Sequence, residues 1–285
     1  MSKLKIAIQK SGRLSEKSLS LLSDCGIKLP NGDRKLKSEA SNFPIEVLFL
    51  RDDDIPQYVE DGVADIGIVG ENEVWEKGKD IITIQKLGFA QCRMSLAIPQ
   101  DEQYTGPDYF NHKKIATSYP GILQQFLDEQ RVEARIEEIG GSVEIAPSIG
   151  LSHGIFDIVS TGSTLLMNGL KEVEVVRRSE AVLVSNNALM SEKRMLLEQL
   201  TFRINAVIDA AFNKYIMLNA PNEKLDDIVS LLPGMKSPSV LPLRLPGWSS
   251  VHTVVKEQMF WDVTAKLKSL GAQGILVLDI KKMVL

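Results

Sequence analysis

Short apolar runs alternate with amphipathic stretches over roughly the first two-thirds of the chain. This alternation is typical of parallel strands connected by helices. Helical spacing is found over residues 14–25 and 54–61, and residues 120–129 begin with proline, which a first helical turn tolerates. The runs expected to form strands are LKIAIQ, PIEVLFL, ADIGIVG, CRMSLAIP, KKIATSY and GIFDIVS. The pattern predicts an α/β fold with doubly wound sheets.

Two lobes are expected in this part of the chain. The segment 99–112 (PQDEQYTGPDYFNH) is polar and rich in turn residues, so we expect the chain to cross there between the lobes. The strand-like runs EVEVV and AVLVSN precede an amphipathic stretch from residue 191 to about 213, which is expected to be a helix that leads out of the body. The first lobe is expected over 1–98, completed by about 183–212, and the second over 99–182.

Residues 213–285 follow a different order of elements. The segment reads as strand KYIML, a helix over 223–232, strands SVLPL and SVHTVV, a helix over 257–270, and strand GILVLDI. This β-α-β-β-α-β order is that of the ferredoxin-like unit. We therefore expect a separate C-terminal domain.

Composition narrows the class of protein. With 285 residues the chain is longer than a domain with a single hydrophobic core usually is. Its composition, 44% apolar and 25% charged residues, is that of an ordinary globular protein. A net charge of −4 argues against nucleic-acid or anionic-membrane binding, and no span approaches the ~20 apolar residues of a membrane helix. The apolar part of MSKLKIAIQKSGRL is too short for a secretory signal, and Cys25 and Cys92 form no CxxC pair. We expect a soluble protein of the reducing cytoplasm.

The histidines do not predict a metal site. His112, His153 and His252 lie far apart in the sequence and lack the close His/Cys pairing of common zinc motifs. No metal ion held by protein ligands alone is expected.

Four expected strand ends carry unusual polar residues, and ligands of parallel sheets bind at such ends. The first is a glycine turn with two cations, residues 9–13 (QKSGR). The second, residues 51–54 (RDDD), has a run of carboxylates that is more often a helix N-terminal cluster than a catalytic pair. The third is Gly70-Glu71-Asn72, and the fourth is residues 157–164 (DIVSTGST).

The fourth strand end has the features of an anion site. A strand is expected to end near Ser160, Gly162 permits a positive φ, and Ser163 and Thr164 open a helix. Free backbone N–H groups and hydroxyls then point into one concavity, which suits a phosphate monoester. The alternative is an ordinary helix cap, because Ser and Thr are common before helices.

Asp157 strengthens the functional interpretation. A carboxylate inside the apolar run GIFDIV is costly unless it is paired or solvated at the rim of a site. Together with Glu144 it is suited to accept hydrogen bonds from two ribose hydroxyls and to stabilise positive charge as a bond to C1 breaks. The alternative is an aspartate that caps a helix or satisfies backbone amides.

Residues 144–165 (EIAPSIGLSHGIFDIVSTGSTL) resemble the signature of the ATP phosphoribosyltransferases. The resemblance covers essentially the whole chain through QKSGRLS, RDDDIP, DGVADIGIVGEN, IATSYP, NGL and SLLPGMKSPSVLPL. It is closest to the long form of the family, which carries a C-terminal domain. The resemblance implies a catalytic core like the periplasmic binding proteins, with a ferredoxin-like regulatory domain at residues 213–285.

The resemblance also implies a reaction. Members of the family join ATP to phosphoribosyl pyrophosphate (PRPP) through adenine N1 and release pyrophosphate, which Mg²⁺ accompanies, as the first step of histidine biosynthesis. Glu144 and Asp157 would bind the ribose. The implied 5-phosphate ligands are Asp157, Ser160, Thr161, Gly162, Ser163 and Thr164, and the implied ATP and pyrophosphate ligands are Lys10, Arg13, Arg51, Glu71, Arg93 and Tyr119.

For the C-terminal domain the resemblance implies L-histidine as a feedback inhibitor and a homo-oligomer, a hexamer built from dimers. The implied histidine contacts are Asn219, Met235, Ser239 and Gly274. Asn219 stands where some relatives have an acidic residue. The alternative for this domain is a purely structural oligomerisation module.

A different class of function remains open, a two-lobed protein that binds small anions without catalysis. The expected cytoplasmic location disfavours it. The absence of a GxGxxG motif after the first strand, and of a P-loop, argues against a dehydrogenase and a kinase-like enzyme.

Overall fold

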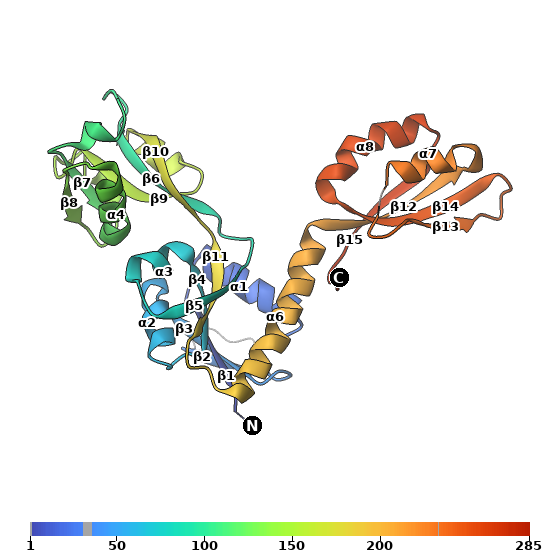
Figure 1. Ribbon diagram of the computed structural model, residues 1–285, viewed down its shortest axis with the longest axis horizontal. Helices are drawn as coiled ribbons and strands as arrows, with labels where there is room; N and C mark the ends of the chain where they lie inside the picture. Colours follow the sequence, from blue (N-terminus) through green and yellow to red (C-terminus); the bar gives the residue numbers. More distant parts are fainter. Residues whose placement is uncertain (1, 31–35, 233) are drawn as a thin grey trace. The chain divides into compact units, whose positions relative to one another are not determined.

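The computed structural model describes residues 2–30, 36–232 and 234–285. The chain divides into two compact units, Met1–Ser20 with Ile27–Leu196, and Leu21–Gly26 with Leu197–Leu285. The first unit contains two sheets and the second contains one (Figure 1). No helix in the described ranges is long and apolar enough to cross a membrane.

The first sheet of the first unit has six strands in the order β2-β3-β1-β4-β11-β5. Strands β1, β3 and β4 are parallel, and β11 runs antiparallel to both β4 and β5. Ile6, Ala7 and Ile8 are consecutive and fully buried, so β1 is covered on both faces, as three apolar residues in a row predict. The strands are β1 (Leu4–Gln9), β2 (Lys37–Glu39), β3 (Ile45–Leu50), β4 (Ile66–Gly70), β5 (Ile81–Lys86) and β11 (Ala181–Asn186). The helices are α1 (Arg13–Asp24), α2 (Ile55–Glu60) and α3 (Glu71–Lys77).

The second sheet has five strands in the order β10-β6-β9-β7-β8. Strands β7, β8 and β9 are parallel, whereas β6 is antiparallel to its neighbours β9 and β10. Its core includes the fully buried Phe110 and Phe156. The strands are β6 (Cys92–Pro99), β7 (Lys114–Thr117), β8 (Arg135–Glu138), β9 (Gly154–Val159) and β10 (Leu170–Ser179), and the helices are α4 (Pro120–Gln130) and α5 (Ser163–Met167).

The crossing between the two sheets differs from the prediction. The chain leaves the six-stranded sheet between β5 and β6, over residues 87–91, and returns at Glu180 between β10 and β11. The expectation of a crossing at 99–112 is wrong, because that segment joins β6 to β7 within the five-stranded sheet. Its turn residues bring Tyr104 and Phe110 to the core of that sheet. The true crossing is short and contains one glycine, and it turns at Gly88 (φ +75°) and Ala90 (φ +51°) without a cluster of turn residues, so composition did not reveal it.

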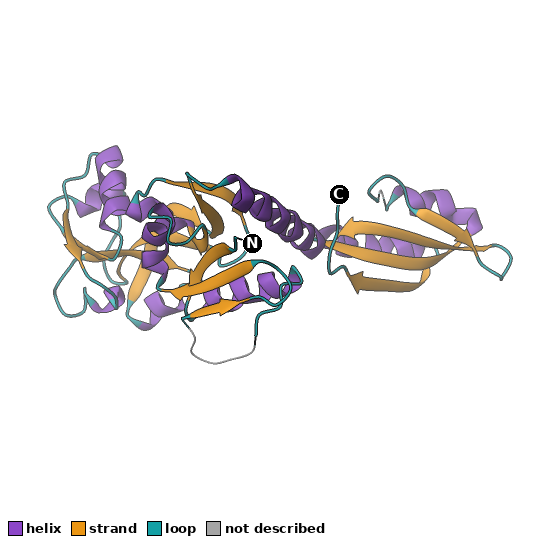
Figure 2. Ribbon diagram, turned by 90° about the horizontal axis from the view of Figure 1, so that it is seen from below, coloured by secondary structure: helices purple, strands orange, loops and turns teal. Residues whose placement is uncertain are grey.

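The second unit confirms the predicted ferredoxin-like order. After α6 (Ser191–Ala211) come β12 (Asn213–Pro221), α7 (Leu225–Ser230), β13 (Ser239–Pro242), β14 (Trp248–Lys256), α8 (Glu257–Ser269) and β15 (Gln273–Asp279). The sheet order is β13-β14-β12-β15, and α7 and α8 lie on one side of it (Figures 1 and 2). Ile216, Leu218 and Ala220 alternate along β12 and are fully buried, whereas Tyr215 on the other face is exposed.

Candidate functional site

The predicted cations near the N-terminus gather at one edge of the six-stranded sheet. Because β1 and β3 are parallel, the turn after Gln9 and the segment after Leu50 open at the same edge, and the Lys10 N–H donates to the Leu50 carbonyl at 2.7 Å. Lys10, Arg13 and Arg51 are exposed there. The Arg51 Nε lies 3.2 Å from Asp53 Oδ1, so its charge is partly balanced locally.

The carboxylate run after Arg51 begins a helical segment. Asp52–Asp54 form a single 3-10 turn that leads directly into α2. This is the arrangement of a helix N-terminal charge cluster, the interpretation favoured from the sequence.

Glu71 and Glu73 at the start of α3 have different surroundings. The Glu71 carboxylate lies 3.1 Å from the Lys86 Nζ, and its N–H donates to the Glu180 carbonyl at the return crossing. Glu73 is only 5% exposed, and its Oε1 accepts hydrogen bonds from the Tyr119 hydroxyl at 3.0 Å and from Asn72 Nδ2 at 3.0 Å. Burial raises the pKa of Glu73 to about 7, and the nearby Asp52 and Asp53 carboxylates add to this, against the hydrogen bond from Tyr119.

Glu73 is a site residue that sequence reasoning missed. Its only signal was its position directly after the Gly70-Glu71-Asn72 junction. What sets it apart is its partner Tyr119, which lies 46 residues away in the sequence and follows a strand of the other sheet.

Two further contacts of α3 reach the five-stranded sheet and its helix. The Glu76 carboxylate accepts the Gly121 N–H at 2.9 Å and the Ile122 N–H at 3.0 Å, which caps the start of α4. The Arg177 guanidinium lies 3.8 Å from the centre of the Trp75 ring. With the Glu73–Tyr119 bond, these contacts connect α3 to the five-stranded lobe.

Residues 157–164, which we call the hydroxyl loop, form the expected turn from strand to helix. Gly162 has φ +82° and occupies the cap position of α5, where it offers no side-chain acceptor to the first amides of the helix. Ser160, Thr161, Ser163 and Thr164 are exposed. The Thr161 and Ser163 hydroxyls lie 3.0 Å apart, and so face a common space.

Asp157 and Glu144 lie close enough to interact electrostatically. Burial raises the pKa of Asp157 to about 6; a hydrogen bond from the Ile158 N–H opposes this shift, and the charge of Glu144 adds to it. Glu144 lies in a 3-10 turn over Val143–Ile145. Burial raises the pKa of Tyr119 most, and the charges of Glu73 and Asp157 add to this, so carboxylates of both lobes act on this phenol.

Arg93 lies beneath the hydroxyl loop. Its Nη1 donates to the Ser160 carbonyl at 2.8 Å, and its Nε and Nη2 each lie 2.5 Å from an oxygen of Glu172. These bonds occupy all three nitrogens of the guanidinium, so Arg93 differs from the exposed Lys10, Arg13 and Arg51.

The predicted histidine contacts lie on or near the sheet of the second unit. Asn219 on β12 and Gly274 on β15 are neighbours, since a Cβ on Gly274 would lie 3.5 Å from the Asn219 Nδ2. Ser239 pairs with His252 across β13 and β14, and Met235 is 55% exposed just before β13.

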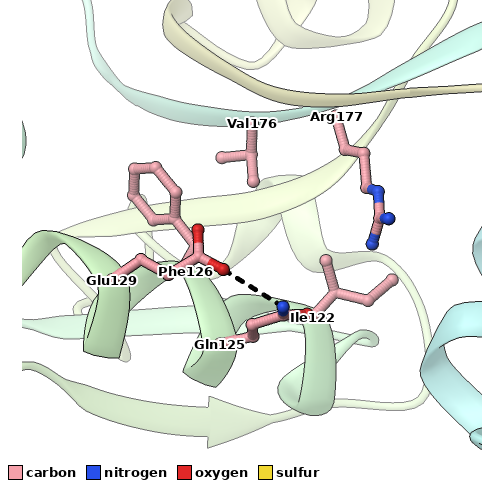
Figure 3. Close-up of a pocket in the computed structure, with 6 residues that line it drawn as sticks. All are labelled: Ile122, Gln125, Phe126, Glu129, Val176 and Arg177. Atoms are coloured by element: carbon pink, nitrogen blue, oxygen red, sulfur yellow. Dashed lines mark hydrogen bonds between the residues drawn. The ribbon is translucent and has the colours of Figure 1, made fainter.

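A separate pocket lies on the five-stranded lobe, between α4 and β10. It has a volume of about 270 Å³ and is lined by Ile122, Gln125, Phe126, Glu129, Val176 and Arg177 (Figure 3). The Gln125 amide donates to Glu129 at 3.1 Å along one wall. None of the predicted site residues lines this pocket. The pocket is therefore separate from the site predicted from the sequence.

The described residues do not provide a complete set of ligands for a metal ion. Residues 2–30, 36–232 and 234–285 contain no cluster of three or more His, Cys, Asp or Glu side chains arranged to hold a metal ion. The carboxylates of Asp52–Asp54 are oxygen donors of the kind that Mg²⁺ accepts singly, together with water and phosphate oxygens.

Two family descriptions match the chain. Residues 51–206 match ATP phosphoribosyltransferase, and residues 210–282 match the C-terminal domain described as HisG, C-terminal domain. An ATP phosphoribosyltransferase of Bacteroides fragilis is 57% identical over 282 residues, 99% of this chain and 100% of the relative. One of Parabacteroides distasonis is 58% identical over 281 residues, 99% of each.

Solved structures give the same family and a wider fold likeness. The ATP phosphoribosyl transferase (HisG:HisZ) complex from Thermotoga maritima matches with TM-score 0.63 and 32% identity, over 72% of this chain and 98% of that chain. The substrate binding protein of an amino acid ABC transporter matches with TM-score 0.50 over 73% of this chain and 94% of its own. At 10% identity the latter likeness concerns the fold alone.

Proposed function

The chain belongs to the ATP phosphoribosyltransferase family, and we propose that the residues gathered at the two sheet edges carry the family's reaction. The chain is an ATP phosphoribosyltransferase of histidine biosynthesis. The enzyme transfers phosphoribosyl from PRPP to N1 of the ATP adenine and releases pyrophosphate. The observation that carries our assignment of the site is the hydroxyl loop, with its left-handed Gly162 and exposed hydroxyls at the end of β9.

The hydroxyl loop binds the 5-phosphate of PRPP. Gly162 has no side chain to cap α5, and the Ser163 N–H makes only a long hydrogen bond of 3.4 Å to the Thr161 hydroxyl; amides at the start of a helix favour an anion. Four hydroxyls surround them, those of Ser160, Thr161, Ser163 and Thr164.

Asp157 and Glu144 bind the ribose hydroxyls. With a pKa of about 6, Asp157 is mostly ionised at neutral pH, so it accepts hydrogen bonds and stabilises positive charge as the bond from C1 to pyrophosphate breaks. Lys10, Arg13 and Arg51 face the charges of ATP and pyrophosphate from the other edge, with Glu71 and Tyr119 on the nucleotide side.

The reaction needs no covalent enzyme intermediate. The lone pair of adenine N1 forms the new bond to C1, and the electron pair of the broken C–O bond leaves with pyrophosphate. Positioning and fixed charges supply most of the acceleration of such a step. Mg²⁺ enters with pyrophosphate, neutralises its charge, and takes at most one or two carboxylates from the chain, with Asp52–Asp54 as candidates.

We further propose that residues 213–285 bind L-histidine as a feedback inhibitor and take part in a homo-oligomer, a dimer and a hexamer, in the cytoplasm. The proximity of Asn219 and Gly274 supports a small-ligand site. Calorimetry with L-histidine tests the proposal. Heat of binding is expected, and no binding to folded protein would leave this domain a structural role.

The assay that tests the reaction mixes protein, ATP, PRPP and Mg²⁺ and follows the near-ultraviolet absorbance of N1-phosphoribosyl-ATP. Absorbance should rise only when all the components are present. Omission of Mg²⁺ and of PRPP are the controls. Absence of turnover by folded protein would favour a small-anion binding protein.

The double variant Asp157→Asn with Thr161→Ala tests the site. It should raise the KM for PRPP, because it removes the negative charge and one acceptor oxygen of Asp157, and also the Thr161 hydroxyl. Unchanged PRPP kinetics would contradict the assignment of the hydroxyl loop.

A further inference from the structure

Arg93 and Glu172 form an ion pair directly behind the hydroxyl loop. Two nitrogens of the Arg93 guanidinium lie 2.5 Å from the two oxygens of Glu172, and the third donates to the Ser160 carbonyl at 2.8 Å. The planar guanidinium has its N–H groups in a fixed fork, so the carboxylate that binds one side also orients the side that faces Ser160. Glu172 therefore sets the direction in which Arg93 holds the loop.

The strand register places Arg93 on the same face of the sheet as Asp157. Ser95 is the cross-strand partner of Asp157, and alternation along β6 puts Arg93 on the same face as Ser95. The Ser95 hydroxyl, on a residue only 1% exposed, donates to Glu172 Oε1 at 2.7 Å. Strand β10 has a register irregularity immediately after Glu172, a feature that re-aims side chains near active sites.

Charge gives the pair a second role. The hydroxyl loop already contains the Asp157 carboxylate, with the charge of Glu144 close to it, and an unpaired Glu172 would add a third carboxylate that repels a phosphate. The hydrogen bond from Arg93 lowers the pKa of Glu172, which keeps this carboxylate ionised and paired. The side chains of Arg93 and Glu172 are 25% and 23% exposed, so solvent screens the pair only in part.

We propose that Arg93 and Glu172 are positioning residues for the 5-phosphate of PRPP, which fix the Ser160 carbonyl and neutralise the carboxylate behind the loop. This inference rests on the proposed phosphate role of the hydroxyl loop. It separates Arg93 from the cations that face ATP and pyrophosphate.

The experiment compares Arg93→Met with wild type by calorimetry with ribose 5-phosphate, which has no pyrophosphate, and by steady-state kinetics. We expect ribose 5-phosphate to bind between about tenfold and hundredfold more weakly, because the loss of a hydrogen bond to a charged group has an effect of this size. The KM for PRPP should rise in parallel, whereas the KM for ATP should stay within about twofold of wild type.

The second variant is Arg93→Met with Glu172→Gln. Glu172→Gln removes the charge that Arg93→Met leaves unpaired, but it does not restore the contact with the Ser160 carbonyl. The affinity for ribose 5-phosphate should therefore recover in part and remain weaker than that of wild type. The matched control is Arg135→Met, which breaks another Arg–Glu contact (2.9 Å to Glu137) at the start of β8, on the opposite edge of the same sheet. It should leave all these parameters unchanged.

Two results would overturn the inference. Arg93→Met with wild-type affinity for ribose 5-phosphate and a raised KM for ATP would make Arg93 a nucleotide ligand. A double variant no better than the single one would remove the charge role of Glu172. If Arg93→Met does not fold, Arg93→Lys tests the same point, since a single ammonium cannot reproduce the fork. Turnover by wild type tests the proposed function separately.

Discussion

Replacing Glu73 by glutamine should make the protein more stable at pH 8 than wild type, and much less so at pH 5. The folded state raises the pKa of Glu73 from an ordinary 4.5 to about 7. Between these values the folded protein binds more protons than the unfolded chain, so the free energy of unfolding falls as the pH rises through this window. The full shift corresponds to about 3 kcal/mol, and at 5% exposure the carboxylate is little screened by solvent.

Glu73→Gln keeps the oxygen that accepts from Tyr119 but does not titrate. The stability of the variant relative to wild type should therefore improve by most of this amount, about 2–3 kcal/mol, between pH 5 and pH 8. Urea unfolding at each pH measures it. Trp75 lies in α3 beside Glu73, so a Trp248→Phe, Trp261→Phe background makes fluorescence report on this helix, since the chain has 3 tryptophans.

The matched control is Glu60→Gln. The pKa of Glu60 is lowered, mainly by the hydrogen bond from the Asp80 N–H, so its contribution is lost only as the pH falls toward the acid range. Between pH 5 and pH 8 the difference between this variant and wild type should be nearly constant. If the Glu73→Gln difference is equally constant, Glu73 does not titrate near neutrality and the argument from burial fails.

Three substitutions test the packing and the caps. Gly154→Ala should lower the free energy of unfolding by about 1–3 kcal/mol, since its Cβ would lie 2.8 Å from a ring carbon of Phe110; urea denaturation measures this. Glu76→Ala should lower it by about 1 kcal/mol, and lower the melting temperature, because the first amides of α4 lose their acceptor. Lys193→Met should cost about 3 kcal/mol, because Asp65, 8% exposed in its side chain, loses the ion pair at 2.8 Å; adding Asp65→Asn should restore part of the loss in a double-mutant cycle.

Each of the three has a result that would contradict it. Gly140→Ala is the control for Gly154, since a Cβ there meets nothing within 4 Å; equal losses would mean that contact with Phe110 is not the cause. An unchanged melting temperature in Glu76→Ala would show that water replaces the cap. Additive effects of the Lys193 and Asp65 changes would show that the two side chains are not coupled.

The sequence predicted the elements of the fold well because local pattern determines them. The expected helix over 14–25 is found at Arg13–Asp24 and the one over 120–129 at Pro120–Gln130. The apolar runs became strands because each is long enough to be buried in a sheet. The crossing between the lobes was misplaced because the short connection over 87–91 has only one glycine and no cluster of turn residues, whereas the turn-rich segment 99–112 belongs to a single sheet.

The candidate site could be predicted only where the functional residues lie close together in the sequence. Asp157 stands out as a carboxylate in an apolar run, and its raised pKa reflects the burial that such a run implies. Arg93 looked like any other cation, because its partner Glu172 lies 79 residues away. Glu73 gave no signal beyond its position after Asn72, because its partner Tyr119 lies 46 residues away. A residue whose role depends on a partner far away in the sequence cannot be recognised from the residues next to it.

The double crossing determines how the two lobes can move. The outgoing and returning segments are hydrogen-bonded to each other, from the pair Lys86 and Val182 in one sheet to the pair Cys92 and Ser179 in the other. Between these pairs, Leu87 N–H donates to the Ala181 carbonyl and Ala181 N–H donates to the Phe89 carbonyl, each at 2.9 Å. A two-stranded ribbon bends out of its plane without losing these bonds, whereas sliding one strand along the other breaks them. These hydrogen bonds are compatible with hinge bending of the two lobes about this ribbon and oppose shear between them.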